Sequence, residues 1–490
     1  MRLSDATLAR LPPAVARPGY DRAAVQPGIV HLGIGAFHRA HQAVCTDAVL
    51  RGGDLRWGTV GVSLRSPATR NALAPQDGLF ALNIRAEADE YRVIGSVQRL
   101  LVAPESPGAV IEAMTRPEVR IVSLTITEKG YCLDPSGGPS GGPSCGVDAA
   151  NPDIRHDLAH PASPRSAPGL LVEAIARRRA AGLAPFTVLS CDNLAGNGKA
   201  LHRVLRGLAG LRGPHSGGPN LGVPDHGGPD LAAYVADRIA CPSTMVDRIV
   251  PATTDADLAR TDAALGMHDA WPVVGEPFLQ WVIEDRFSAG RPDWESHGAT
   301  VVADVAPFEA MKLRLLNASH SALAYLGLLA GCETVADAVA DPRLAAFAAG
   351  LMRDAARTVA APPGTDVQAY QQALLARFAN RALRHRLAQI AMDGTQKLPP
   401  RLLAPMQELL AQGQRAERHA MAVAAWMQHV ATAAVVQDPR AEELARVVRA
   451  DGPAALLDLP GLFGAGPPSP AARRAVLAAL AALPRVVGRA

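Results

Sequence analysis

The stretch IVHLGIGAFH, residues 29–38, decides the fold of this 490-residue chain. Its first four residues form a short apolar run, and Gly33 and Gly35 follow at once. Such a run is typical of a buried strand that ends in a tight turn. The first glycine permits the bend, and the second lets backbone N–H groups approach a pyrophosphate. His38 replaces the third glycine of the usual pattern. We predict a variant dinucleotide-binding turn made of Gly33, Gly35, Ala36, Phe37 and His38.

The segments that follow alternate between strand-like and helix-like patterns. Strand-like runs occupy residues 59–64, 120–126 and 186–190, and residues 170–181 between the last two have helical periodicity. Strand, helix, strand in that order indicates a crossover between parallel strands. Residues 1–298 are therefore predicted to form an α/β Rossmann-type domain that binds NAD(P). Two G-G-P-containing segments, 134–146 and 210–229, are predicted to be surface loops.

From about residue 307 the pattern becomes almost entirely helical. Strand signals nearly vanish, and Ala- and Leu-rich stretches with helical spacing follow one another. Residues 299–490 are therefore predicted to form an all-helical domain that supplies substrate-binding and catalytic residues. The expected helices cover residues 308–329, 335–351, 367–378, 381–392, 401–412, 416–431, 439–450 and 470–483.

Composition narrows the class of protein. Charged residues make up 19% of the chain, the net charge is +3, and no run of like charges could serve as a nucleic-acid arm. No apolar run reaches the roughly 18 residues of a membrane span, and residues 1–15 lack the pattern of a signal peptide. The six cysteines include no C-x-x-C pair. We predict a cytoplasmic protein, a monomer with other oligomeric states left open, that has no nucleic-acid or membrane partner.

The coenzyme preference depends on the end of the second predicted strand. An acidic residue there would hold the ribose 2′-hydroxyl, but the chain continues with Leu64-Arg65-Ser66-Pro67, and Arg70 lies close by. We predict NAD, with NADP left open because an arginine could hold a 2′-phosphate.

His38 and His41 are three residues apart, yet the sequence near them offers no third ligand. No metal site is predicted.

The most informative spacing lies in PFEAMKLRLLNASH, residues 307–320. With Lys312 at zero on an α-helix, Glu309, His320 and Asn317 fall at about 60°, 80° and 140°. Four functional polar groups would then share one side of a helix that is otherwise apolar. Lys312 is also one of only four lysines among 49 cationic side chains. Where arginine is the default cation, a remaining lysine is a candidate for a group that must lose its proton.

This set suits the interconversion of an alcohol and a ketone. A desolvated lysine with a lowered pKa can accept the hydroxyl proton, and amide and imidazole N–H groups can donate to the developing alkoxide. Asn193 could supply a second amide because it follows the predicted strand at 186–190, and the carboxyl ends of parallel strands line the ligand cleft. The alternative for Asn193 is a turn former in its N-L-A-G-N-G run.

The chain resembles the polyol-specific long-chain dehydrogenases, which form the mannitol dehydrogenase family. It looks most like the fructuronate reductase (D-mannonate oxidoreductase) branch. The segments that carry the resemblance span nearly the whole chain. They are IVHLGIGAFHRAHQAVCTD (29–47), IVSLTITEKGYC (121–132), FTVLSCDN (186–193), TMVDRIVPATT (244–254), EPFLQWVIED (276–285), PFEAMKLRLLNASHSALAYLG (307–327) and LRHRLAQIAMDGTQKLPPRLL (383–403).

The resemblance implies a role for each matching position. Lys312 matches the general base, Asn193 and Asn317 match the two amides around the reacting oxygen, and His320 matches a histidine that orients substrate. Glu309 matches a carboxylate on the proton exit path. The remaining implied positions contact substrate: Lys397 matches a lysine that binds hydroxyls, and Asp247 an acid near the polyol chain.

One departure from the family pattern bears on the substrate. Gln389 stands where polyol-oxidising members carry an arginine, which argues against plain mannitol. Arg384, Arg386 or Arg401 could bind a uronate carboxylate as a bidentate fork, and a solvated basic face is the alternative. The resemblance therefore implies an oxidoreductase for D-mannonate and D-fructuronate. The alternatives are mannitol 2-dehydrogenase or another hexitol or pentitol dehydrogenase and, from another class, a non-catalytic dinucleotide-binding sensor.

Overall fold

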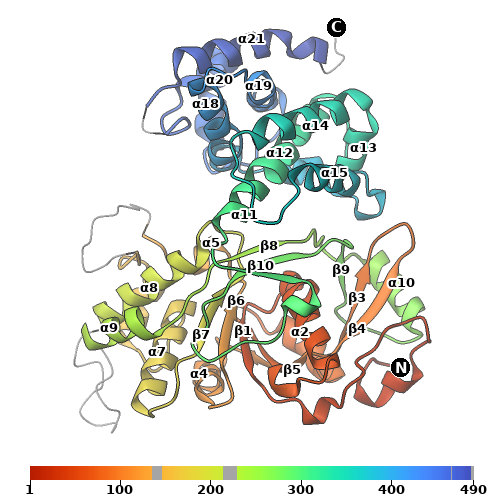
Figure 1. Ribbon diagram of the computed structural model, residues 1–490, viewed down its shortest axis with the longest axis vertical. Coiled ribbons are helices and arrows are strands. Elements are labelled where there is room, and N and C mark those ends of the chain that lie inside the picture. Colours follow the sequence, from red (N-terminus) through yellow and green to blue (C-terminus); the bar gives the residue numbers. More distant parts are fainter. Residues whose placement is uncertain (135–145, 213–228, 465, 487–490) are drawn as a thin grey trace. The chain divides into compact units, whose positions relative to one another are not determined.

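The computed structural model describes residues 1–134, 146–212, 229–464 and 466–486. Contacts divide the chain into two compact units, Met1–Val305 and Ala306–Ala490. The first unit combines strands and helices and the second is helical (Figure 1), which confirms the predicted fold class. The expected boundary at 298/299 precedes this division because residues 299–302 form a strand that pairs within the first unit. Apart from their ends, the predicted loops at 134–146 and 210–229 lie outside the described residues.

The strands of the first unit are short, whereas its helices reach 15 residues in α8. The strands are β1 (Ile29–Leu32), β2 (Thr59–Ser63), β3 (Phe80–Ile84), β4 (Glu90–Ile94), β5 (Val97–Val102), β6 (Ile121–Leu124), β7 (Thr187–Ser190), β8 (Thr244–Asp247), β9 (Val273–Gly275), β10 (Gln280–Glu284) and β11 (Ala299–Val302). The α-helices are α1 (Ala36–Ala40), α2 (Gln42–Arg51), α3 (Ala68–Leu73), α4 (Pro107–Thr115), α5 (Thr127–Gly130), α6 (Pro152–Ala159), α7 (Ala167–Ala180), α8 (Asn197–Leu211), α9 (Pro229–Arg238) and α10 (Asp255–Leu265).

The main sheet of the first unit has the order β5-β2-β1-β6-β7, and every pair in it is parallel. Successive residues of each strand point to opposite faces of the sheet. Val30 packs with α4, α7 and α8, whereas Ile29 packs with residues of α2 on the other face. Figure 1 shows these helices on the two sides of the sheet. Burial of both faces explains why the inner strands β2, β1 and β6 are largely apolar and lack polar alternation. The predicted strand–helix–strand crossover is β6–α7–β7 and is confirmed.

Two smaller sheets complete the first unit, and the sequence analysis missed their strands. One has the order β4-β3-β9 and the other β11-β10-β8. Strand β5, which forms one edge of the main sheet, was not predicted either. Several of these strands carry charged residues among apolar ones, as in EYRVI (90–94) and VQRLLV (97–102), so they lack the continuous apolar character of the strands that were predicted.

The second unit is built around α12 (Ala318–Leu329), almost all of which is buried. Its core contains Leu323, Tyr325 and Trp426, and helices from most of the unit contribute to it. The other helices are α11 (Ala306–Met311), α13 (Val335–Ala340), α14 (Pro342–Ala356), α15 (Val367–Phe378), α16 (Leu387–Ile390), α17 (Gly394–Leu398), α18 (Ala404–Ala411), α19 (Glu417–Thr432), α20 (Ala441–Asp451) and α21 (Pro470–Val486). Two π-helical segments interrupt the α pattern: η6 (Lys312–Asn317) and η8 (Pro399–Leu403).

The helix predicted for residues 381–392 is wrong. That region contains a 3₁₀ turn at Arg381–Leu383 and only the short helix α16. Arg384 has a left-handed backbone conformation (φ 45°), and Arg386 forms a bridge with Thr334. A residue in that conformation ends a right-handed helix, so the helical spacing of the side chains is not realised here. The other 3₁₀ turns are Asp5–Arg10, Arg22–Ala24, Leu55–Trp57, Ala74–Gln76, Glu295–His297 and Pro453–Asp458.

Candidate active site

The glycine turn directly follows β1. Gly33 has a φ of 95°, and a Cβ atom there would lie 2.1 Å from the backbone oxygen of Thr125. Only glycine fits a site with both features. Gly35 is the N-cap of α1 and is exposed, and a Cβ there would meet only the Gly33 oxygen at 3.7 Å. Open backbone at this point fits the close approach of a dinucleotide phosphate.

A chain of hydrogen bonds supports this turn from inside. The Thr125 hydroxyl donates to the Gly33 oxygen (2.8 Å), so its own oxygen is left to accept from His31 Nε2 (2.9 Å). The other ring nitrogen, Nδ1, lies 2.8 Å from the Ser123 hydroxyl and is the acceptor there. Burial lowers the pKa of His31 to about 3. A neutral histidine with its proton on Nε2 therefore ties β6 to the carbonyl of the turn.

His38 faces the protein interior. It is 2% exposed, its ring stacks on that of His31 with centroids 3.5 Å apart, and neither ring nitrogen has a hydrogen-bond partner. The pKa of His38 lies well below its usual range. Burial is the main cause, and the nearby His31 is the second. Phe37 is half-buried and stacks on His41. Among the described residues, no three His, Cys, Asp or Glu side chains gather as a metal site would require.

The end of β7 is fixed by Asp192, a residue that the sequence analysis did not single out. Its buried carboxylate accepts hydrogen bonds from the backbone N–H groups of Ile126 and Thr127 and from the Tyr131 hydroxyl. Burial raises the pKa of Asp192, against the lowering effect of these bonds. Thr127 has a φ of 67°, a conformation that is unfavourable for a β-branched residue. Asp192 thus holds together the ends of β6 and β7, directly before the exposed Asn193.

Of the other predicted polar residues of the first unit, Asp247 and Arg65 lie at strand ends and Arg70 lies on α3. Asp247 is the last residue of β8, is 6% exposed, and pairs with Gln280 of β10 in the antiparallel ladder. Arg65 is exposed after β2. Arg70 makes an ion pair with Glu105, so its guanidinium already has a carboxylate partner.

Lys312 begins the π-helical segment and is 7% exposed. The wider π turn changes the angle between successive residues, so the angles predicted for an ideal α-helix do not apply across it. A π segment inside an α-helix is frequently found at functional sites. Asn317 ends the segment and is half-buried, as is Glu309 in the turn before it. Lys312, Asn317 and His320 therefore lie on one helical stretch that contains a π bulge. The spacing of these residues in the sequence could not reveal the bulge.

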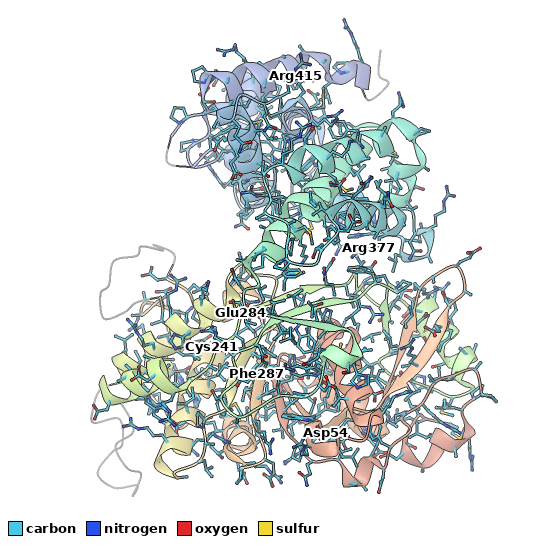
Figure 2. All side chains as sticks on the ribbon, viewed as in Figure 1. Asp54, Cys241, Glu284, Phe287, Arg377 and Arg415 are labelled. Carbon is cyan, nitrogen blue, oxygen red and sulfur yellow. The ribbon has the colours of Figure 1, made fainter. Side chains whose placement is uncertain are left out.

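His320 lies in a cationic environment. Its ring centroid is 4.5 Å from that of Phe378 and 5.2 Å from that of His385, and its Nε2 is buried without a hydrogen-bond partner. Burial holds the pKa of His320 well below its usual range, and electrostatic repulsion by neighbours that include Arg377 and Arg401 acts in the same direction. Arg377 is on α15 of the same unit (Figure 2). The imidazole is therefore neutral and can donate one hydrogen bond.

The residues predicted to contact substrate differ in their exposure. Lys397 is half-buried: its ammonium donates to the Ile390 oxygen (3.4 Å) and lies 3.8 Å from an Asp393 oxygen. Burial and then the charge of Arg401 lower the pKa of Lys397. Gln389 is exposed on α16. Arg401 lies in η8 and donates from Nη1 to the Ser321 hydroxyl (3.1 Å) and the Asn317 carbonyl (3.5 Å). The structure thus brings Arg401 against the stretch that bears Asn317 and His320.

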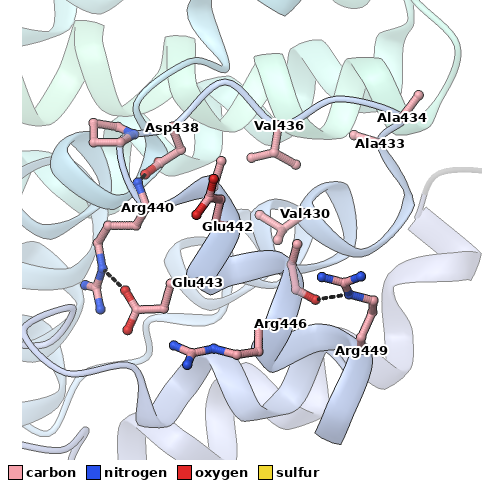
Figure 3. A pocket seen from close by; sticks show the side chains of 13 residues that line it. Val430, Ala433, Ala434, Val436, Asp438, Arg440, Glu442, Glu443, Arg446 and Arg449 are labelled. Carbon is pink, nitrogen blue, oxygen red and sulfur yellow. Dashed lines mark hydrogen bonds and ion pairs between the residues drawn. The ribbon is translucent and has the colours of Figure 1, made fainter.

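A separate groove of about 1130 Å³ lies between the end of α19 and α20. Figure 3 shows its walls, which carry charges of both signs; the Arg440–Glu443 ion pair and the Arg449 hydrogen bond to the Ala445 carbonyl are drawn there. None of the predicted site residues lines it. We therefore do not assign the alcohol–ketone reaction to this groove.

Both units match known families. Residues 27–296 match the mannitol dehydrogenase Rossmann domain, and residues 304–483 match the mannitol dehydrogenase C-terminal domain. The chain is 45% identical over 467 residues to D-mannonate oxidoreductase of Escherichia coli, with 92% of this chain and 91% of that protein covered. The part of the chain that the structure describes contains no helix long and apolar enough to cross a membrane.

Two solved structures are similar over essentially the full chain. The mannitol 2-dehydrogenase of Pseudomonas fluorescens, solved as a ternary complex with NAD and D-mannitol, is 39% identical with a TM-score of 0.84. A D-sorbitol dehydrogenase in substrate-free form is 30% identical with a TM-score of 0.86. Each comparison covers 100% of this chain and 99% of the other.

Proposed function

The chain belongs to the mannitol dehydrogenase family, and we propose that within this family it is a fructuronate reductase, which interconverts D-mannonate and D-fructuronate. The coarser assignment is an NAD(P)-dependent oxidoreductase that acts on a secondary alcohol of a polyol or a sugar acid. The observation that carries the proposal is an almost fully buried lysine, Lys312, in a π segment that leads to Asn317 and His320. The 45% identity to a D-mannonate oxidoreductase favours the sugar acid.

The residues of the glycine turn fit a dinucleotide. Gly33 supplies the backbone conformation and the close approach, and Gly35 leaves the start of α1 open. A bound nicotinamide coenzyme supplies the acceptor for the hydrogen and electron pair that leave the alcohol carbon. We propose NAD as the coenzyme because the similar Pseudomonas enzyme holds NAD and because Arg70 is already paired with Glu105.

The chain's own residues would manage the proton of the alcohol. Lys312 takes the hydroxyl proton, since burial disfavours the charged form of an amine. Asn193, Asn317 and the neutral His320 donate hydrogen bonds to the oxygen as it gains negative charge. Glu309 would then carry the proton away from the amine. In the same proposal Asp247, Lys397 and Gln389 contact the hydroxyl groups of the substrate.

The second candidate is a mannitol 2-dehydrogenase, which the similarity to the Pseudomonas enzyme supports. Both candidates are tested by following NADH formation with D-mannonate and then with D-mannitol, using NAD and NADP in turn. We expect the highest kcat/KM for D-mannonate with NAD. A higher value for D-mannitol would select the second candidate.

The free thiols of the described cysteines agree with the reducing cytoplasm that we propose as the location.

The role of Lys312 is tested by Lys312→Met and Lys312→Arg. We expect both variants to lose turnover by about a hundredfold or more, because neither side chain can accept the proton at neutral pH. NADH binding, followed by its fluorescence, should be unchanged. Lys199→Met is the matched control because Lys199 is an exposed lysine on α8. Turnover of Lys312→Met near that of the unaltered enzyme would contradict the assignment.

A further inference from the structure

Arg401 is held by the same helical stretch that carries the candidate catalytic residues. Both of its hydrogen bonds leave from Nη1 and go to the Ser321 hydroxyl and the Asn317 carbonyl. Asn317 and Ser321 flank His320 along the chain. The guanidinium is therefore anchored at one corner, next to the imidazole proposed to bind the reacting oxygen.

The rest of this guanidinium has no counter-ion among the residues that the structure describes. Within the described residues, no carboxylate lies within 4.0 Å of Arg401, and Nε and Nη2 make no hydrogen bond. The side chain is nevertheless half-buried, and burial lowers its pKa to about 10. Partly burying a charge without a partner is costly. The free edge of Nε and Nη2 has the geometry that binds both oxygens of a carboxylate.

Other basic side chains lie in the same region. Arg377 and Arg401 both lower the pKa of His320 electrostatically, after the larger effect of burial. Acidic charges from Asp393 and Asp438 act instead on Lys397. An anion bound at Arg401 would therefore be attracted by the guanidinium, whereas an uncharged polyol would gain no such attraction.

The other two arginines that the sequence offered for this role are poorly suited. Arg384 and Arg386 are both exposed, and Arg384 lies 3.9 Å from the Glu333 carboxylate. Binding of an anion by exposed arginines is weakened by water and salt. Arg401 alone among the three combines partial burial with a free bidentate edge.

We propose that Arg401 binds the carboxylate of a sugar-acid substrate through Nε and Nη2, and that it is the residue which selects sugar acids over polyols. The inference rests on the proposed function, because it assumes that the alcohol is oxidised at the site that carries Lys312 and His320. It extends that function by assigning the specificity to one side chain.

The test compares a charged and an uncharged ligand in two variants. In Arg401→Met we expect kcat/KM for D-mannonate to fall on the order of a hundredfold, mainly through KM, while that for D-mannitol changes less than about threefold. Arg401→Lys should recover only part of the loss because an ammonium keeps the charge without the fork. Arg415→Met, which alters an exposed arginine just before α19 (Figure 2), is the control.

A second measurement separates this inference from the proposed function. Calorimetric titration of the NADH-loaded protein with D-mannonate and with D-mannitol reports binding without turnover. Tighter binding of D-mannonate that disappears in Arg401→Met supports the inference even if the enzyme converts no D-mannonate, in which case only the proposed function fails. Equal losses for both ligands, or no preference in the unaltered protein, would overturn it. Should Arg401→Met fail to fold, Arg401→Lys decides by the same comparison.

Discussion

At the scale of single residues, the first unit depends on side chains that are buried without charge. His31 donates from Nε2 to Thr125 and accepts at Nδ1 from Ser123, and the second of these bonds needs the neutral ring. Protonation at Nδ1 would replace the acceptor that Ser123 uses and would place a charge beside His38, which stacks on the same ring. The structure of the glycine turn is therefore coupled to the ionisation of a residue that does not itself belong to the turn.

This coupling predicts a pH dependence of stability. The pKa of His31 is about 3 in the folded state, whereas an unfolded histidine titrates near 6.5. The unfolded chain therefore binds more protons, and the free energy of unfolding should fall as the pH drops below about 6.5. The contribution of His31 is about 1.4 kcal/mol per pH unit between the two values. We expect urea midpoints, followed by tryptophan fluorescence, to fall less steeply with acid in His31→Gln.

The control for this experiment is His160→Gln, since His160 is exposed. Its urea midpoints should follow those of the unaltered protein at every pH. If His31→Gln and the unaltered protein lose stability with the same slope, His31 is not the titrating group.

At the scale of elements, the π segment η6 determines how Lys312 is oriented relative to the residues that follow it. An α-helix turns by about 100° per residue, and the wider π turn adds one residue to the repeat. One extra residue inserted after Leu313, in a helix that otherwise keeps its repeat, would rotate Asn317 and His320 by about 100° relative to Lys312.

We therefore predict that inserting one alanine after Leu313 lowers kcat/KM by more than about a hundredfold. The far-ultraviolet circular dichroism should remain nearly unchanged because the helix continues with a normal repeat. The substitution Leu313→Ala keeps the number of residues and should stay within a few-fold of the unaltered enzyme. An insertion variant with normal kcat/KM would show that the angle between Lys312 and the residues after η6 has no part in arranging the site.

The same element shows what the sequence could and could not predict. Continuous apolar runs predicted the inner strands of the main sheet, such as β1 and β6, because burial on both faces leaves a clear pattern. The sequence also identified Lys312 and Asn317 as candidate site residues. It did not predict the π bulge or the left-handed conformation of Arg384, because both depend on tertiary packing and leave no mark on the spacing of residues in the sequence. Asp192 was also missed, although an acid directly after a parallel strand is a signal that could have been used.

At the scale of the whole molecule, the two units have separate hydrophobic cores. Among the described residues, every buried cluster belongs wholly to one unit: the core around α12 contains no residue before Met311, and the clusters of the α/β unit end at Ala299. Each unit therefore holds the apolar surface that it needs for its own cooperative unfolding.

A core substitution should consequently act on one unit. Leu323 is fully buried in α12, and we expect Leu323→Ala to cost about 3 kcal/mol through the lost burial and the cavity it leaves. Differential scanning calorimetry should show a lower melting temperature for one transition, with a second transition unmoved. Val122→Ala in β6 is the reciprocal control and should move the other transition. Equal shifts of both transitions by either variant would show that the units unfold as one.

The closed space at Gly33 limits how this protein can change over evolutionary time. The atom that would collide with a side chain at this position is the peptide oxygen of Thr125. Every amino acid carries that oxygen, so no exchange at residue 125 could create room. A lineage that lost the glycine would have no compensating substitution at the point of collision, and reversion of the original codon would be its direct route back.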